Sequence, residues 1–184
     1  MKMNLQDYIA IYNINNYIDC KNIIRLIEPS NWQKHSYNNP VTNENTTYKD
    51  DLDVSYQDKG TTELIKNMVS KFVADYIKTV SSMRFSLQDL SEPRFNRYEI
   101  GSNMKPHVDH IHTMFDGERK GVPIITVLGL LNDDFEGGDF LLFDDKKVNL
   151  EAGDVIIFPS NFLYPHSVTT ITKGTRYSFV SWGY

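Results

Sequence analysis

The chain has 184 residues and a formal net charge of −5 at pH 7, which suits one domain of ordinary size. Binding to a phosphate backbone rests on clustered lysine and arginine, so this acidic balance disfavours a nucleic-acid partner. Its single cysteine, Cys20, excludes a disulfide within the chain and is typical of a reducing cytoplasm. The N-terminal stretch has no long apolar run, and we expect neither a signal peptide nor a membrane span. The sequence therefore predicts one cytoplasmic domain over 1–184, monomeric and without a membrane partner.

The N-terminal half predicts two helices joined by a polar stretch. Residues 8–14 are apolar and β-branched, which favours a short strand. Residues 15–28 repeat apolar side chains near a 3.6 period and predict an amphipathic helix that ends before a proline. Residues 61–82 predict a second such helix. Between them, 30–60 is rich in Asn, Thr and Asp and reads as a long loop, either a lid over a binding site or a solvated linker.

The C-terminal half, 91–184, changes to short strands separated by turn signals such as EAGD and TKG. Eight strands at this spacing, without helices between them, indicate an antiparallel sandwich or jelly roll. The helices of 1–90 would then support one sheet from outside. The predicted strands cover 95–100, 107–112, 122–131, 138–143, 146–150, 154–158, 164–171 and 175–182.

The stretch KPHVDHIH at 105–112 predicts a metal site. Alternate residues of a strand share a face, so His107 and Asp109 can chelate one ion together. A third ligand must come from elsewhere, and jelly-roll topology favours His166 over His35, which lies in the polar stretch. Two imidazoles and one carboxylate leave positions open opposite them, which suits non-haem Fe(II) better than a closed zinc site. Because His-x-Asp alone is short and common, solitary histidines remain an alternative reading.

Arg176 follows His166 by ten residues, so strand, turn and strand bring the two side by side. On 175–182, Arg176 shares the inward face with Ser178 and Trp182. Burying an arginine is costly without an anion, and a guanidinium with a hydroxyl two residues on is suited to a carboxylate. The alternative is an arginine paired with a structural Asp or Glu.

His-x-Asp, a distal His and then Arg-x-Ser resemble the Fe(II)/2-oxoglutarate-dependent dioxygenases, and more closely the prolyl 4-hydroxylase-type subgroup in its bacterial and viral branch. The likeness extends over 97–109, 135–143, 151–160 and 164–182, about half of the chain in the order typical of the family. It implies a mainly β fold, a double-stranded β-helix (a jelly roll) with supporting N-terminal α-helices.

The resemblance also implies a role for each matching residue. His107, Asp109 and His166 would be the catalytic Fe(II) ligands. Arg176, helped by Ser178, would bind the distal carboxylate of 2-oxoglutarate, and the hydroxyl of Tyr98 would lie beside this co-substrate. The residues expected on the substrate side are Trp182 and Arg97.

The chain departs from the family pattern at several positions. Leu130 stands where many relatives carry a tyrosine that also contacts the co-substrate, and Met104 where an aromatic residue is frequent. Arg176 replaces the lysine of the collagen-type enzymes, so the oxygen-sensor and bacterial prolyl hydroxylases are more similar. Asp109 disfavours the halogenase variant. Trp182 stands where nucleic-acid demethylases have a second arginine, which disfavours DNA or RNA repair.

The resemblance thus implies hydroxylation of a C–H bond with O2 and 2-oxoglutarate, releasing succinate and CO2. A prolyl residue of a protein or peptide is the leading substrate, and ascorbate is a candidate further cofactor. A free amino acid or another small molecule is an alternative substrate. The rival functions are a redox-inert metal-binding jelly roll and a carbohydrate-binding jelly roll that uses Trp182 and tyrosines.

Overall fold

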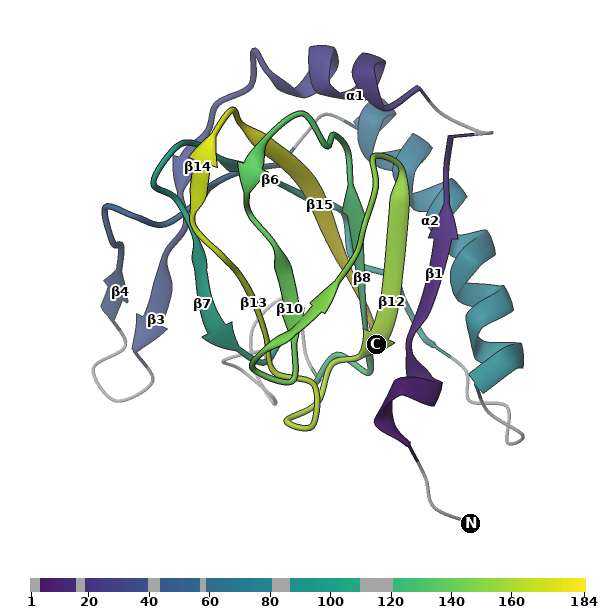
Figure 1. Ribbon diagram of the computed structural model, residues 1–184. Coiled ribbons are helices and arrows are strands. Elements are labelled where there is room, and N and C mark those ends of the chain that lie inside the picture. The colour runs from purple at the N-terminus through teal and green to yellow at the C-terminus, as the bar shows by residue number, and fades with distance from the viewer. Residues whose placement is uncertain (1–3, 16–18, 40–43, 57–58, 81–86, 110–120) are drawn as a thin grey trace.

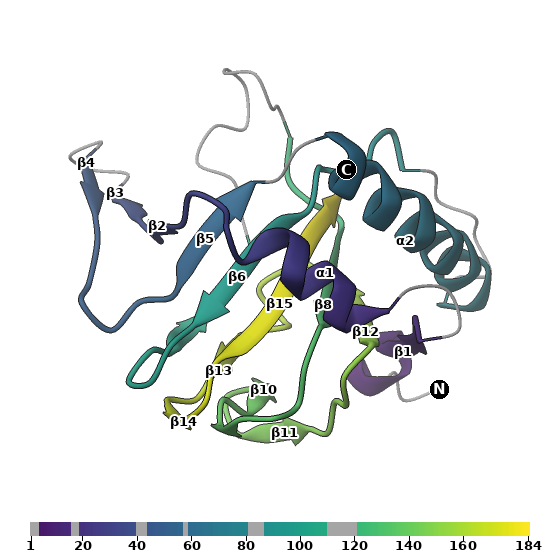
Figure 2. The same ribbon diagram turned by 90° about the horizontal axis from the view of Figure 1, so that it is seen from above.

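The computed structural model shows two antiparallel β-sheets that face each other, with helices on one side (Figures 1 and 2). It describes residues 4–15, 19–39, 44–56, 59–80, 87–109 and 121–184. The major sheet has the strand order β1-β12-β8-β15-β6-β5-β2 and the minor sheet the order β11-β10-β13-β7. The major-sheet strands are β1 (Ala10–Asn13), β12 (Asp154–Pro159), β8 (Ile125–Leu130), β15 (Arg176–Gly183), β6 (Arg94–Tyr98), β5 (Asp53–Tyr56) and β2 (Gln33–Lys34).

The minor sheet lies in front of the major sheet in Figure 1. Two further two-stranded pairs are present, β14 with β9 and β3 with β4. The remaining strands are β11 (Lys146–Val148), β10 (Phe140–Leu142), β13 (His166–Val168), β7 (Met104–His107), β14 (Ile171–Lys173), β9 (Glu136–Gly137), β3 (Tyr37–Asn39) and β4 (Glu44–Thr46). Alternating side chains of both sheets fill the space between them, and the residues buried there include Leu128, Phe140, Leu142, Ile156, Phe158 and Val168.

The helices cover the outer face of the major sheet, as Figure 2 shows for α1 and α2. The turn η1 (Leu5–Tyr8) precedes β1, and α1 (Cys20–Ile27) begins where the Asp19 carboxylate accepts from the Lys21 N–H. Helix α2 (Lys59–Val80) buries one side against the sheet. This second core includes Ile23, Ile27, Ile65, Val69, Phe95, Val127, Ile157 and Phe179.

Among the described residues, no helix combines the length and the apolar character needed to cross a lipid bilayer.

The expected fold class, a mainly β jelly roll with N-terminal helices, is confirmed. The single predicted strand 164–171 is divided into β13 and β14. The strand predicted at 107–112 was misplaced, since β7 ends at His107 and Asp109 follows it in an irregular segment; 110–112 lie outside the described residues.

The prediction of a long loop over 30–60 was wrong. This stretch contains β2, β3, β4 and β5, and β5 pairs with β6 so that the major sheet gains two strands at this edge. Its polar residues find partners there: the carboxylate of Asp53 is largely buried between Arg97 and Lys34, at 3.0 Å and 2.9 Å.

Candidate metal centre

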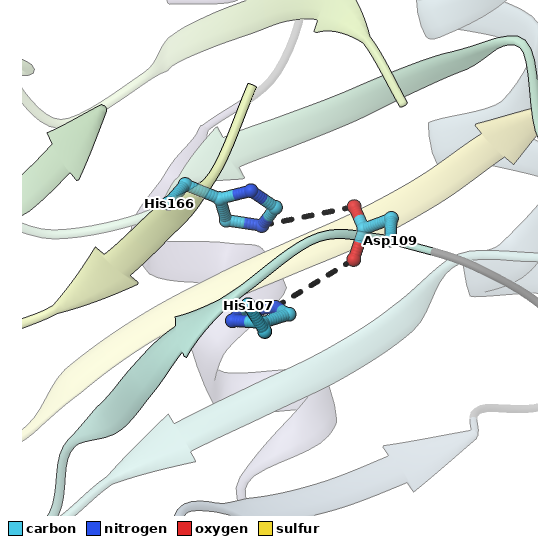
Figure 3. A group of neighbouring side chains, drawn as sticks. All are labelled: His107, Asp109 and His166. Atoms are coloured by element: carbon cyan, nitrogen blue, oxygen red, sulfur yellow. Dashed lines mark ion pairs between the residues drawn. The ribbon is translucent and has the colours of Figure 1, made fainter. Parts of the chain in front are cut away.

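Three side chains converge on one point, two from neighbouring strands of the minor sheet and one from the segment that follows β7 (Figure 3). His107, the last residue of β7, lies directly opposite His166, the first residue of β13. The carboxylate of Asp109 lies beside the two rings and directs one oxygen toward each, with Oδ1 3.6 Å from the Nε2 of His107 and Oδ2 3.7 Å from the Nε2 of His166. One potential ligand atom from each residue lies within 4.8 Å of the others. The three residues that the sequence predicts as ligands are therefore brought together.

Main-chain carbonyls orient both imidazole rings. The Nδ1 atom of His107 lies 2.8 Å from the carbonyl of Lys105, and the Nδ1 atom of His166 lies 3.2 Å from the carbonyl of Tyr164. A carbonyl can only accept, so each Nδ1 must carry the proton. Each Nε2 is then left with a free lone pair directed at the other ligands, as a metal ligand requires.

The protonation states also suit a cation. Burial, and then the neighbouring His166, lower the pKa of His107 to about 4, although Asp109 works in the opposite direction. Burial alone would raise the pKa of Asp109. His166, His107 and the Thr126 hydroxyl outweigh it and bring that pKa below its ordinary value. At neutral pH the site thus presents a neutral His107 and a carboxylate.

A hydroxyl pair that the sequence reasoning missed holds this carboxylate in place. Thr126 Oγ1 donates to Asp109 Oδ2 at 2.6 Å, and its oxygen lies 2.6 Å from Ser160 Oγ. Because Thr126 has a single hydroxyl proton, Ser160 must be the donor of the second bond. Both hydroxyls are buried. The signal in the sequence was a polar residue within the apolar run IITVLGLL, whose side chain needs a buried partner.

Arg176 is the largest side chain among those that are fully buried, with 1% of its surface exposed. It donates through Nη1 to Ser178 Oγ at 3.0 Å, and its guanidinium lies 5.1 Å from the ring centre of Tyr98, its cross-strand partner on β6. Burial lowers its pKa. Among the described residues no carboxylate pairs with Arg176, and its Nε has no hydrogen-bond partner. The expected cluster of Arg176, Ser178 and Tyr98 is thus assembled without a structural acid.

A cavity of about 170 Å³ adjoins Arg176. Its wall includes Phe135, Phe140 and Leu130, the position at which the resemblance leads one to expect a tyrosine. Phe140 also lines a smaller cavity, of about 20 Å³, into which the three candidate ligands open. Phe140 thus borders both the cavity beside the guanidinium and the one beside the candidate metal centre.

The two residues expected on the substrate side lie in different places. Trp182 lines the small cavity beside the candidate ligands. Arg97 lies on the opposite face of β6, where it pairs with Asp53 and Glu28 and lies over the ring of Trp32. The structure therefore does not bring Arg97 to the site, because strand alternation places Arg97 and Tyr98 on opposite faces.

The C-terminal half matches the family model described as the 2OG-Fe(II) oxygenase superfamily, over residues 93–184. A PKHD-type hydroxylase of Delftia acidovorans is 37% identical over 97 residues, which cover 49% of this chain and 42% of that protein. A PKHD-type hydroxylase of Hyphomonas neptunium is 39% identical over 97 residues, with the same coverage. The matched part thus spans about two fifths of these relatives' length.

Solved structures share the fold at low identity. A prolyl hydroxylase of Trichoplax adhaerens, in complex with a peptide fragment of the hypoxia inducible factor oxygen degradation domain, gives a TM-score of 0.70 at 18% identity; the match covers 97% of this chain and 84% of that one. A viral collagen prolyl hydroxylase of Paramecium bursaria Chlorella virus-1, in complex with 2OG, gives 0.65 at 13% identity, with 95% and 94% covered. With half of its length matched by the family model and with this fold, the chain belongs to the 2OG-Fe(II) oxygenase superfamily.

Proposed function

We propose that this protein is an Fe(II)- and 2-oxoglutarate-dependent oxygenase that hydroxylates a C–H bond and releases succinate and CO2. The observation that carries the proposal is the combination of two features on one interior face. Two imidazoles with free Nε2 atoms converge with one carboxylate, and a buried guanidinium lies nearby without an acidic partner among the described residues. A redox-inert metal site has no use for the second feature.

The donor set fits Fe(II). Two neutral imidazoles and one carboxylate are the ligands typical of non-haem iron oxygenases, and His107, Asp109 and His166 would hold the ion. Bound iron would supply the redox chemistry that couples decarboxylation of 2-oxoglutarate to hydroxylation of the substrate. The protein's own contribution is to fix the ligands and to keep the site in a dry, enclosed space.

Arg176 would bind the distal carboxylate of 2-oxoglutarate through charge-assisted hydrogen bonds, with Ser178 orienting the guanidinium. The Tyr98 hydroxyl would lie beside the same co-substrate. The cavity of about 170 Å³ next to Arg176 offers room on this side of the barrel. With Leu130 in its wall, the hydrogen bond that a tyrosine gives in many relatives is absent.

For the substrate, a prolyl residue in a protein or peptide is the proposal that the family supports best. PKHD-type hydroxylases and prolyl hydroxylases are what the chain is similar to in sequence and in fold, respectively. Ascorbate, as a reductant that maintains Fe(II), belongs to the same proposal, and so does a monomeric protein in the cytoplasm.

The test is turnover of 2-oxoglutarate to succinate with Fe(II), for the wild type, Asp109→Ala and Arg176→Met. We expect succinate from the wild type, none from Asp109→Ala, and a KM for 2-oxoglutarate raised about 10- to 100-fold in Arg176→Met, the range of a lost charge-assisted bond. Arg176→Met should also melt no lower than the wild type, because an apolar replacement of a buried, unpaired charge is often neutral or stabilising.

Two results would contradict the proposal. Absence of succinate from the wild type, with and without prolyl peptides, would favour the redox-inert metal site. A large loss of thermal stability in Arg176→Met, without any change in KM, would show that the arginine serves the fold and not the co-substrate.

A further inference from the structure

A second arginine, Arg94, lines the small cavity beside the candidate ligands, whereas Arg176 lines the other cavity. Arg94 begins β6 and shares its inward face with Asn96 and Tyr98. Its side chain contributes to the wall of the small cavity into which His107 and Asp109 open. A cation thus faces the centre at which the proposed reaction would take place.

Two contacts hold the Arg94 head group in place. Its Nε donates to the Oδ1 of Asn96 at 3.1 Å, and Asn96 is itself buried. Its guanidinium lies 5.2 Å from the ring centre of Trp182, a favourable distance for a cation over an aromatic face. Neither contact uses the two Nη groups, which are the part of an arginine that forms a fork for a carboxylate.

Arg94 has no carboxylate partner in the described ranges of the chain, although ion pairs to Arg97 and Lys34 are present nearby. The contrast with Arg97, three residues further along β6, is direct. Arg97 faces outward, pairs with Asp53 and stacks on Trp32. A half-buried guanidinium that is oriented by a neutral amide and an indole, and not by an acid, is arranged to receive an anion from outside the chain.

His35, which directly follows β2, is a second polar side chain with an unused buried atom. Its Nδ1 is buried and has no hydrogen-bond partner among the described residues. Burial lowers its pKa to about 4, and Arg94 and then His107 contribute in the same direction. A neutral imidazole beside a cation can donate or accept one more hydrogen bond from a bound molecule.

The register of the major sheet separates Arg94 from Arg176, the residue proposed to bind 2-oxoglutarate. Arg94 on β6 pairs with Val180 on β15, and Tyr98, four residues further along β6, pairs with Arg176. At about 3.4 Å per residue, the two guanidiniums start from backbone positions about 14 Å apart along the strands. The carboxylate of Asp109 lies towards the Arg94 end, because its donor Thr126 pairs with Trp182. One small dicarboxylate that reaches Arg176 therefore leaves Arg94 free.

From this arrangement we infer that Arg94 anchors the substrate, and that the substrate carries a carboxylate close to the carbon that is hydroxylated. The inference rests on the proposed oxygenase function and adds a substrate class to it. The carboxylate has two possible sources: the α-carboxylate of a free amino acid, or an acidic residue beside the reacting residue of a peptide. Both present the same group to the guanidinium.

Two matched pairs of probes test this: L-proline with L-prolinamide, and acetyl-Ala-Pro-Glu-Ala-amide with its Gln analogue. Binding is measured calorimetrically to protein loaded with Mn(II) and 2-oxoglutarate, so that no turnover is needed. We expect the wild type to bind the acidic member of at least one pair about tenfold or more tightly than its amide, as a charge-assisted contact implies. The pair that is discriminated identifies the source of the carboxylate.

The variants then assign the effect to Arg94. Arg94→Met should bind both members of the pair equally, Arg94→Lys should keep part of the preference, and both should bind 2-oxoglutarate as the wild type does. Arg25→Met, which removes an exposed charge on α1, is the control and should keep the full preference. If Arg94→Met does not fold, Arg94→Gln, which keeps a donor for Asn96, takes its place.

Three results would overturn the inference: no preference for the acid in either pair, a preference that persists without the Arg94 charge, or a weaker affinity for 2-oxoglutarate in Arg94→Met. Failure of the proposed function would look different. In that case the wild type would form no succinate with Fe(II) and would not bind 2-oxoglutarate at all.

Discussion

The hydroxyl of Thr126 shows how much of the candidate metal centre depends on a residue that is not a ligand. Asp109 lies beyond the end of β7, so the pairing of strands does not hold its main chain, and its side chain needs another restraint. The 2.6 Å bond from Thr126 Oγ1 to Asp109 Oδ2 supplies that restraint from β8, and Ser160 on the neighbouring chain segment supports it. The carboxylate is thus positioned by the major sheet and the histidines by the minor sheet.

We therefore expect Thr126→Val to weaken metal binding about 10- to 100-fold, the usual cost of losing a partner that orients a ligand. Valine has the shape of threonine, so the fold should be retained. Titration of Mn(II) into the metal-free protein by calorimetry measures the effect, and Thr79→Val, on the exposed side of α2, is the matched control. An unchanged affinity in Thr126→Val would mean that the hydroxyl does not orient Asp109.

Strand β15 is a single element that contributes side chains to both cores. Arg176 and Ser178 face the space between the two sheets, while Phe179 faces the helices and lies edge-on to Phe95. Gly129 on β8 pairs with Phe179, and a Cβ at this position would collide with the Phe179 ring. The glycine thus allows an aromatic ring to lie flat across the neighbouring strand.

Gly129→Ala should destabilise the protein by about 1–3 kcal/mol, the usual cost of overpacking a rigid core. The Phe179 ring has no free space in which to move, because it is fully buried. Urea unfolding measures the loss. In the double variant Gly129→Ala/Phe179→Leu the two changes should cost less than their sum, because the smaller side chain makes room for the methyl group. Strict additivity would place the origin of the effect elsewhere.

Hydrophobic alternation was sufficient to predict the inner strands, because each of them buries at least one face in a core. It predicted β8, β12 and β15 to within about three residues at each end. It failed for β2 to β5, whose sequences QK, YNN, ENT and DVSY contain few apolar residues. Strands β5 and β2 extend the major sheet, and β3 pairs with β4 in a separate two-stranded sheet. Both pairings are made by backbone hydrogen bonds, which nearly any sequence can form, so no pattern of side chains identifies these strands.

At the candidate centre, the sequence was sufficient to predict the residues that belong to a motif. It was insufficient to predict those that reach the site only through the folding of the chain. His107, Asp109 and His166 form the cluster that spacing and resemblance predicted as a metal site. Arg94 and His35 could not be assigned, because neither belongs to a motif and β2 to β5 had been read as a loop. Arg97 was expected on the substrate side, but strand alternation directs it outward.

Across the whole molecule, the two sheets contribute to one centre, so ligands bound there should stabilise the fold. A ligand at one hundred times its Kd adds about 2.7 kcal/mol, which for a chain of this size corresponds to a rise in Tm of about 5–10 °C. We expect Mn(II) to raise the Tm, 2-oxoglutarate to raise it further only when Mn(II) is present, and EDTA to reverse both effects. Differential scanning calorimetry measures the shifts. Asp109→Ala should lose both increments, whereas Arg176→Met should keep the metal increment and lose about half or more of the second at the same 2-oxoglutarate concentration. A 2-oxoglutarate increment that is undiminished in Arg176→Met would place the co-substrate away from that guanidinium, because the folded state gains stability only from the contacts that the ligand makes.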